Sequence, residues 1–321
     1  MKKILIYRNC SLGDFIVSLP AIKMIKNQNP NSKIYLASQK KKDVGYVKPN
    51  LIPLKKKIID KYIFFEHNFF SFIKFLKIIK RNKFDKIYYL NGFWSNSFLY
   101  KLISSMRLKR DFLIFWLVGI KEKYGFELKK YNYDIFNETY YLCKRVNDKV
   151  KKNDISLTNL IKKNINNKQK KFITISLGGR NPKKIWKIDY WEILIKAISK
   201  SFPYLSIKII GSKNEIDSAE RIRKINKIKI INMCGKTNIS ALFNIISFSK
   251  YHISHDDGTM HIASCFQKYG VAIFGKVAEK GKWFPSNSNQ KIFFPKLDVN
   301  DTKPGRVFKV VFKDLQKLTD R

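Results

Sequence analysis

The chain alternates between short, continuous apolar runs and longer segments whose apolar residues recur at helical spacing. Residues 2–7 (KKILIY) and 33–37 (KIYLA) have the apolar character of buried parallel strands. A helix is expected between them, kinked or restarted at Pro20, from its spaced apolar side chains Phe15, Leu19, Ile22 and Ile25. Residues 84–90 predict a further strand, whereas residues 93–150 lean toward helix without a decisive pattern.

The same rhythm restarts after residues 151–170, a stretch rich in Lys and Asn. Helices are expected from about Asp189, Glu215 and Ser240, between strands at residues 172–177, 206–210, 228–232, 251–254 and 271–274. Alternation of strand and helix predicts a parallel sheet, and its two occurrences predict an α/β protein with two such sheets.

The length of 321 residues exceeds the usual size of one hydrophobic core, so two domains are expected. Hydrophobic residues make up 45% of the chain, which is enough for two cores. We place an N-terminal domain at residues 1–155, a linker at 156–170 and a C-terminal domain at 171–321. The last helix of the C-terminal domain is a candidate to pack back on the N-terminal domain.

The stretch Tyr251–Gly275 carries the strongest sign of a binding site. It predicts a strand, a polar glycine turn at His255–Gly258, a helix opening near Thr259 and a second strand. Such a turn presents backbone N–H groups and the positive end of a helix dipole to one spot, which suits phosphate. His261 would add a side-chain donor. In the simpler interpretation, Asp256 and Asp257 only cap the helix.

A second glycine–aspartate turn, Gly13-Asp14, follows the first predicted strand. The carboxyl end of a strand is where open α/β sheets hold their ligands. Asp14 would stand at the start of a helix, where a carboxylate complements the helix dipole and also has the chemistry of a general base. The two roles are compatible.

The formal charge of +41 arises from 65 basic against 24 acidic residues, and only 10 of the basic residues are Arg. This excess of Lys, with many Ile and Asn, is typical of an AT-rich coding sequence. It still creates a field that favours anionic partners such as nucleotides, phosphorylated glycans and acidic membrane surfaces. A nucleic-acid-binding protein stays open as an alternative, although the charge is spread along the chain and no nucleic-acid-binding module is recognisable.

The sequence predicts a cytoplasmic protein. No apolar run reaches the length of a membrane span, and the N-terminus lacks the pattern of a signal peptide. The four Cys residues are scattered without CxxC spacing, which fits reduced thiols rather than disulfides or a zinc site.

Residues 69–81 predict a helix with an apolar and a basic face. The apolar face comprises Phe69, Phe72, Ile73, Leu76 and Ile79, and the basic face Lys74, Lys77, Lys80 and Arg81. A core helix with a solvated lysine face explains this pattern. The alternative is a segment resting on the anionic inner face of a membrane, as a peripheral protein would.

Four motifs, in order along the chain, resemble glycosyltransferase family 9, the lipopolysaccharide heptosyltransferase family. Ser11-Leu12-Gly13-Asp14, followed by Leu19-Pro20-Ala21, resembles the family's SLGD…LPA opening, and Lys184-Ile185-Trp186 its K-x-W segment. Gly235-Lys236-Thr237 resembles a third family element, and residues 256–263 (DDGTMHIA) its D(S/T)G-x-x-H-L-A signature. Their common order makes the resemblance specific.

The resemblance implies a GT-B fold, in which two Rossmann-like domains face each other across a cleft. The N-terminal domain would bind the acceptor and the C-terminal domain the nucleotide sugar. It implies an inverting, metal-independent transfer of heptose from ADP-heptose to a lipopolysaccharide core or related glycan, with no cofactor. The alternatives are another nucleotide sugar as donor, a basic nucleic-acid-binding protein, or a non-catalytic scaffold.

The resemblance also implies roles for individual residues. Asp14 would be the catalytic base, with Ser11 and Gly13 on the acceptor side. Donor binding would fall to Lys184 at the diphosphate, Glu215 at the ribose, and Asp256, Gly258, Thr259 and His261. The chain departs from the family at Ser18, where His is frequent, and at Gly178-Gly179, which lack a hydroxyl. Residues 40–150 match only loosely, so the sugar and the acceptor are less determined than the reaction type.

Overall fold

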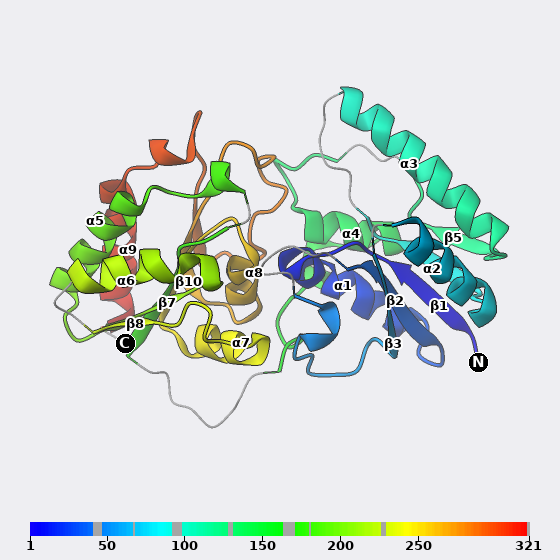
Figure 1. Cartoon of the computed structure of the whole chain (residues 1–321), viewed down its shortest axis with the longest axis horizontal. Coiled ribbons are helices and arrows are strands. Elements are labelled where there is room, and N and C mark those ends of the chain that lie inside the picture. Colours follow the sequence, from blue (N-terminus) through cyan, green and yellow to red (C-terminus); the bar gives the residue numbers. More distant parts are fainter. Residues whose placement is uncertain are drawn as a thin grey trace. The chain divides into compact units, whose positions relative to one another are not determined.

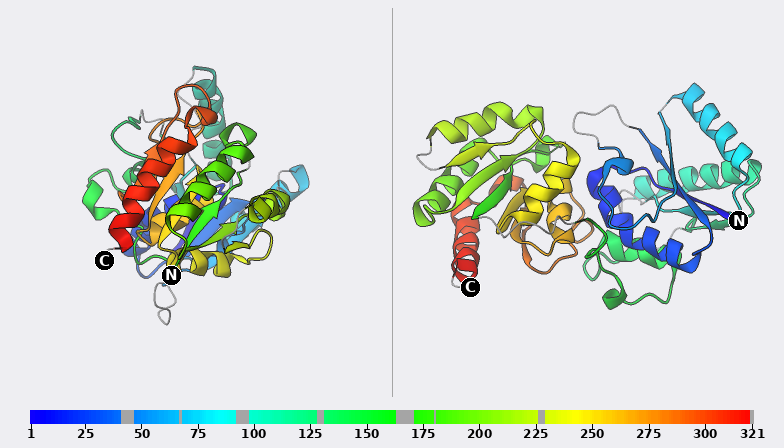
Figure 2. Two further views of the ribbon diagram at one scale, coloured as in Figure 1. Left: turned by 90° about the vertical axis from the view of Figure 1, so that its left-hand side faces the viewer. Right: turned by 90° about the horizontal axis from the view of Figure 1, so that it is seen from below.

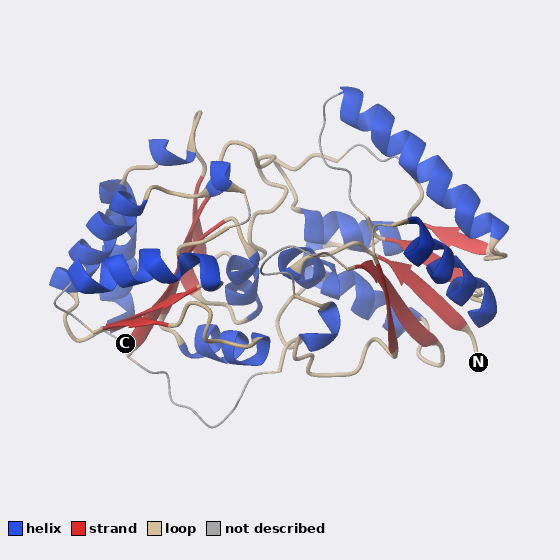
Figure 3. Ribbon diagram, viewed as in Figure 1, coloured by secondary structure: helices blue, strands red, loops and turns tan. Residues whose placement is uncertain are grey.

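A computed structural model describes residues 1–40, 47–66, 68–91, 98–127, 131–162, 171–179, 181–225 and 229–319. The chain forms two compact units, Met1–Asn50 with Lys56–Leu160, and Leu51–Lys55 with Ile161–Arg321. Each unit is a parallel sheet with helices on both faces (Figure 1, Figure 3). The predicted α/β class with two parallel sheets is therefore confirmed.

The division between the units falls inside the stretch expected to be the linker, of which residues 163–170 lie outside the described part. The grouping of Leu51–Lys55 with the second unit was not expected from the sequence. A β-bridge joins Leu54 to Ile161, and the Lys162 N–H donates to the Pro53 carbonyl at 2.7 Å.

The first unit is built on a five-stranded sheet in the order β3-β2-β1-β4-β5. Its strands are β1 Lys3–Tyr7, β2 Lys33–Gln39, β3 Lys61–Phe65, β4 Lys86–Tyr89 and β5 Glu122–Tyr124. Its helices are α1 Leu12–Gln28, α2 Phe69–Asn82, α3 Phe98–Leu117 and α4 Glu138–Val146, with short 3-10 turns at Pro49–Leu51 and Lys152–Asp154. Chain order reverses between β1 and β4, the position at which open sheets hold ligands.

The side chains of β1 alternate between the two faces of this sheet. Leu5 and Tyr7 join a core cluster that also contains Phe75 of α2 and Phe115 of α3. Helices α1 and α4 pack against each other. Pro20 is buried inside α1 and does not end it, so α1 is one continuous helix of 17 residues.

The second unit has a six-stranded sheet in the order β11-β10-β9-β6-β7-β8. Its strands are β6 Phe172–Ser176, β7 Ser206–Ile210, β8 Ile230–Asn232, β9 Tyr251–His255, β10 Tyr269–Ile273 and β11 Gln290–Phe293. Its helices are α5 Ile188–Ser201, α6 Ile216–Ile225, α7 Ile239–Phe248, α8 Gly258–Cys265 and α9 Pro304–Thr319, with 3-10 turns at Pro182–Lys184, Lys213–Glu215 and Val299–Asp301. Here the order reverses between β6 and β9.

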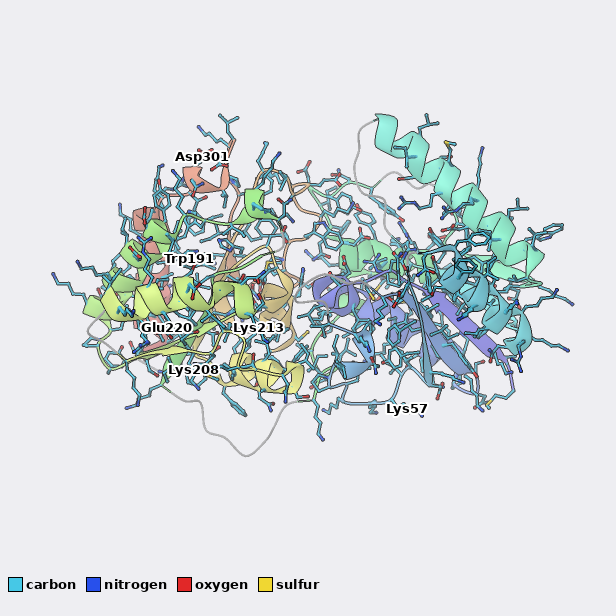
Figure 4. The ribbon with its side chains drawn as sticks, viewed as in Figure 1. Lys57, Trp191, Lys208, Lys213, Glu220 and Asp301 are labelled. Atoms are coloured by element: carbon cyan, nitrogen blue, oxygen red, sulfur yellow. The ribbon has the colours of Figure 1, made fainter. Side chains whose placement is uncertain are left out.

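Helix α9 belongs to the core of its own unit. Val307, Val311 and Leu315 recur every four residues and are fully buried, in the cluster that contains Trp191 of α5 (labelled in Figure 4). The two helices pack side by side (Figure 2). The apolar face of the last helix is thus occupied inside the second unit, by α5 and the sheet.

Candidate functional site

In the second unit, polar side chains gather where β6, β7 and β9 end. Ser176 ends β6, Glu215 follows β7, and Asp256, Asp257 and Thr259 follow β9. Since β6 and β9 are neighbours at the point where chain order reverses, their carboxyl ends meet at the same edge of the sheet. The structure therefore brings residues more than 70 positions apart to one edge.

Lys184 and Asp256, both predicted to bind the donor, form an ion pair at this edge. Lys184 Nζ lies 2.5 Å from Asp256 Oδ2, and the side chains are only 23% and 6% exposed. Lys184 ends the 3-10 turn Pro182–Lys184, between β6 and α5. The pair holds a cation at the sheet edge, where it can exchange its carboxylate partner for a phosphate oxygen.

The loop that carries Lys184 is anchored by Trp186. This side chain is 2% exposed, and its indole Nε1 donates to the Thr302 carbonyl at 2.8 Å. Its ring packs edge-on against Trp191. Burial of the large indole thus fixes the backbone two residues after the lysine.

His255 joins three segments of the site and was missed by the sequence analysis. Its Nε2 accepts the Trp186 N–H at 2.9 Å, and its Nδ1 lies 3.3 Å from the Gly178 carbonyl. This pairing assigns the proton to Nδ1, which donates to Gly178. Burial lowers the pKa of His255 to about 4, so the ring is neutral near pH 7. The available sequence signal was a polar residue directly after the predicted strand 251–254.

Asp257 is the N-cap residue of helix α8. Its Oδ1 accepts the N–H groups of Thr259 at 2.7 Å and Met260 at 3.1 Å, and its Oδ2 accepts the Ser176 hydroxyl at 2.8 Å. The capping role considered for Asp257 is confirmed. The expectation that the first turn leaves its N–H groups free is wrong for these two. Burial raises the pKa of Asp257 to about 6 despite its hydrogen bonds.

Thr259 belongs to the same buried network. Its hydroxyl donates to Asp257 Oδ1 at 2.6 Å and lies 3.1 Å from His252 Nε2. His252 Nδ1 in turn contacts the Thr174 hydroxyl at 2.9 Å. The hydroxyl of Thr259, a residue predicted to bind the donor, therefore bonds within the protein itself, in a chain of contacts that leads into the core.

Gly258 and His261 lie on the first turn of α8, adjacent to this network. His261 is 3% exposed, and every residue from Thr259 to Cys265 is buried with it. Gly258 is the first residue of α8 and directly follows the capping Asp257. Both therefore lie at the edge that carries Lys184 and Asp256.

Glu215 lies against the glycine turn that follows β6. Its Oε2 accepts the Ser212 N–H and hydroxyl, both at 2.7 Å. A Cβ on Gly178 would lie 2.5 Å from Glu215 Cδ, and one on Gly211 would lie 3.0 Å from its Oε2. These two glycines thus make room for the carboxylate, which the sequence pattern did not indicate.

In the first unit, Asp14 stands in the first turn of α1, beyond the end of β1. Its Oδ2 accepts the Ser11 N–H at 3.0 Å and the Ser11 hydroxyl at 2.5 Å. The side chain is 27% exposed, so the carboxylate also reaches solvent. Ser11 caps the helix and Gly13 is its second residue. The three residues predicted from the opening motif therefore form one local unit.

Arg8 is a further charged group beside Asp14. Its side chain is 3% exposed, its Nη1 donates to the Leu90 carbonyl at 2.6 Å, and its Nη2 lies 4.0 Å from Asp14 Oδ1. Among the described residues, its Nε and Nη2 have no hydrogen-bond partner. A basic residue directly after a buried strand was the available sequence signal.

Among the described residues, no group of three or more His, Cys, Asp or Glu side chains could hold a metal ion. The four Cys residues are buried free thiols. In the part of the chain that the structure describes, no helix has the length and apolar character needed to cross a bilayer.

Comparison with known proteins decides the family. The sequence profile of glycosyltransferase family 9 (heptosyltransferase) matches residues 72–303, more than two thirds of the chain. The chain belongs to glycosyltransferase family 9. It is therefore an enzyme of glycosyl transfer, as the motifs predicted. The matched range includes the second-unit site and begins after Ser11, Gly13 and Asp14.

Two named heptosyltransferases are similar to most of the chain. Lipooligosaccharide heptosyltransferase 2 of Campylobacter jejuni is 24% identical over 299 residues, covering 90% of this chain and 86% of that protein. Lipopolysaccharide heptosyltransferase 1 of Campylobacter coli is 24% identical over 321 residues, covering 90% and 89%.

Solved structures show the same fold. A family 9 glycosyltransferase from Veillonella parvula has a TM-score of 0.73 at 12% identity, covering 98% of this chain and 97% of that one. An E. coli heptosyltransferase in complex with ADP has a TM-score of 0.67 at 12% identity, covering 97% and 99%. The predicted two-domain GT-B fold is confirmed.

Proposed function

We propose that this family 9 glycosyltransferase is an inverting, metal-independent heptosyltransferase. Its donor would be ADP-heptose and its acceptor a lipopolysaccharide core or related glycan. The observation that carries the proposal is the ion pair of Lys184 and Asp256 at the sheet edge where β6 and β9 end. The Campylobacter relatives are named for heptosyl transfer to such glycans, and the E. coli structure for its complex with ADP. Both support the choice of substrates.

In this mechanism, Asp14 takes the proton of an acceptor hydroxyl, whose oxygen then attacks the anomeric carbon of the sugar. The bond from that carbon to the diphosphate breaks as the new bond forms, and ADP leaves with the electron pair. One displacement at the anomeric carbon inverts its configuration. Asp14 suits the role because it is ionisable, positioned by Ser11 and accessible to solvent.

Negative charge develops on the departing diphosphate, and a fixed cation is most effective there. Lys184 would supply this charge by exchanging Asp256 for phosphate oxygens. Glu215, held by Ser212, would accept hydrogen bonds from the ribose hydroxyls. Gly258, Thr259 and His261 would shape the remainder of the donor site. A lysine in this role replaces the metal ion that other transferases use, and no cofactor is required.

We further propose that the enzyme works in the cytoplasm, in peripheral contact with an anionic membrane. Buried free thiols fit a reducing compartment. The charge of +41 favours acidic surfaces, and the proposed acceptor is carried by a lipid. No specific nucleic-acid partner is part of this proposal.

Binding of nucleotides to the purified protein tests the donor. Thermal shift would be measured with ADP, UDP, GDP and CDP, and with a mixed oligonucleotide. Stabilisation by ADP above the others is the expected result. Preference for UDP or GDP would indicate that the donor is another nucleotide sugar. Response to the oligonucleotide alone would replace it with nucleic-acid binding.

Catalysis is tested by incubation with ADP-heptose and a heptose-deficient core acceptor. Product formation should be unaffected by EDTA, and NMR of the new linkage should show inversion relative to the donor. Retention of configuration or loss of activity in EDTA would contradict the mechanism.

A further inference from the structure

Helix α3 carries a second apolar face that no part of the described structure covers. Leu102, Met106, Leu113, Trp116 and Leu117, here called the α3 stripe, are between 50% and 65% exposed. At 3.6 residues per turn they fall within an arc of roughly 100° on one side of the helix. A contiguous apolar face of this kind marks an interaction site more often than a random surface.

The α3 stripe is separate from the face that α3 contributes to the core. Leu108, Asp111 and Phe115 point inward and are at most 5% exposed. Leu108 and Phe115 pack in the core cluster of the first unit. The helix is therefore apolar on both sides, and core packing accounts for only one of them. In Figure 1 the amino-terminal end of α3 extends away from the sheet of its unit.

The charges around the α3 stripe have one sign. Lys109 lies within its arc, and the Arg110 side chain, 63% exposed, lies at its edge. The acidic residue of α3, Asp111, is buried and bonded to Tyr89 and Arg110. The stripe is therefore apolar with a basic margin.

Helix α2, which packs in the same core cluster, carries exposed apolar and basic side chains of its own. Phe69 and Phe70 at its start are 72% and 77% exposed, and the helix contains no acidic residue. Of the predicted apolar face, Ile79 is buried and Phe72 and Leu76 pack against the core cluster, together with Phe75. The expectation for Phe69 is wrong, because this side chain is exposed. Its basic residues Lys74, Lys77, Lys80 and Arg81 are exposed, as the amphipathic pattern predicted.

We propose that the α3 stripe, with Phe69 and Phe70 of α2, docks the enzyme on an anionic lipid bilayer. Apolar side chains with an aromatic residue would enter the interface, while Lys and Arg contact acidic headgroups. A second copy of the chain fits less well. In a twofold interface each basic margin would meet another basic margin, and like charges repel. An acidic bilayer supplies the complementary charge.

Co-sedimentation of the full chain with vesicles tests the proposal. Wild-type protein should bind vesicles containing 30% phosphatidylglycerol, bind neutral phosphatidylcholine vesicles at least about ten-fold less, and be released by moderate salt. A Met106→Glu/Leu113→Glu/Trp116→Glu variant should lose at least about ten-fold of the binding to acidic vesicles. A Lys74→Glu/Lys77→Glu/Lys80→Glu variant should weaken it as well.

The matched control is Ile193→Glu/Tyr204→Glu/Ile225→Glu. These side chains of the second unit are between 51% and 55% exposed, so the change in charge and apolar surface is comparable. If net charge alone governed binding, the control would lose as much as the stripe variant, and the proposal would be overturned. Failure of the wild type to bind acidic vesicles would overturn it too.

Two further measurements test whether the α3 stripe contacts the bilayer or a second copy of the chain. Brominated lipids should quench fluorescence of the wild type more than that of a Trp116→Phe variant, and equal quenching would place Trp116 outside the bilayer. Light scattering should find the same mass for wild type and stripe variant. A wild-type dimer that the stripe substitutions dissociate would assign the surface to a second copy.

This inference rests on the proposed peripheral contact with an anionic membrane and assigns the surface that makes it, but it does not depend on the proposed heptosyl transfer. The stripe variant should retain activity on an acceptor dispersed in detergent, because the stripe contains none of the proposed catalytic or binding residues. Absence of transfer by the wild type would refute the proposed function and leave vesicle binding unaffected. The two proposals can therefore fail separately.

Discussion

The guanidinium of Arg8 is buried beside Asp14, with Nη2 4.0 Å from the carboxylate oxygen Oδ1. Arg8 leaves β1 and Asp14 opens α1, so the pair joins the strand end to the first turn of the following helix. Ser11 holds the other carboxylate oxygen through two hydrogen bonds. Asp14 is thus oriented from both sides.

If this orientation serves catalysis, Arg8→Met should lower kcat by about 10-fold or more, with a smaller change in KM for the donor. Arg8→Lys should recover part of the loss because it restores the charge but not the planar fork. Steady-state kinetics and thermal denaturation would be measured together. Loss of stability with unchanged kcat in the remaining folded protein would limit Arg8 to a structural role.

Asp14→Asn should reduce kcat by about 10²–10⁴-fold, because the amide cannot take the proton of the acceptor hydroxyl. Affinity for ADP, measured by calorimetry, should hardly change. The amide oxygen can still accept from Ser11, so the start of α1 should remain intact. A comparable loss of ADP binding would make Asp14 a structural residue rather than the base.

Lys184→Ala should weaken ADP far more than adenosine, because only ADP carries the diphosphate charge that the lysine would meet. The neighbouring Lys183 is exposed, whereas Lys184 pairs with Asp256, so Lys183→Ala is the matched control. Titration calorimetry with both ligands gives the comparison. Equal weakening of ADP and adenosine, or an equal effect of Lys183→Ala, would remove Lys184 from the diphosphate site.

Gly178→Ala should displace the Glu215 side chain, since the new Cβ would lie 2.5 Å from Glu215 Cδ. Affinity for adenosine should fall if Glu215 contacts the ribose. Gly179→Ala is the control, because its Cβ would meet only Ile185 Cγ1 at 3.7 Å.

A double-mutant cycle with Glu215→Ala identifies the cause. If Gly178→Ala acts through Glu215, it should have little further effect once Glu215 is replaced. Full additivity of the two losses would show that Gly178 affects the nucleotide by another route.

Buried His252 and His255 should make the free energy of unfolding depend on pH in the acidic range. Burial lowers their pKa values to about 3 and about 4, whereas histidine in an unfolded chain titrates near 6.5. Between pH 6.5 and 4 the unfolded chain binds protons that the folded rings do not. The free energy of unfolding should therefore fall by about 1.4 kcal/mol per pH unit for each ring as the pH drops.

Asp257 acts with the opposite sign. Its pKa is raised from 3.8 to about 6, so between these values the folded state holds the proton more tightly than the unfolded chain. Its contribution to stability is present at low pH and is lost as the pH rises through 6. Urea unfolding from pH 4.5 to 6.5 should show a shallower pH dependence for His252→Asn and a steeper one for Asp257→Asn. Identical slopes in both variants and the wild type would contradict these assignments.

The sequence by itself determined the double strand–helix rhythm, the glycine–aspartate turns at Asp14 and Asp257, and the order of the four motifs. Local pattern suffices for these features, because strand and helix faces and turn chemistry are set by residues a few positions apart. Family membership followed from the same motifs, since their residues and order are themselves sequence.

Only the tertiary structure decided which residues meet. The contact of Lys184 with Asp256 spans 72 positions and that of Trp186 with His255 spans 69, and no periodicity relates such pairs. The space that Gly178 leaves for Glu215 could likewise not be predicted from the sequence, because it depends on how the ends of β6 and β7 pack. Residues 93–150 carry no decisive pattern in the sequence, and the structure shows that α3 is apolar on two sides. Which side enters the core was settled by the position of the sheet, and the other side remained exposed because the described part of the unit has no element to cover it.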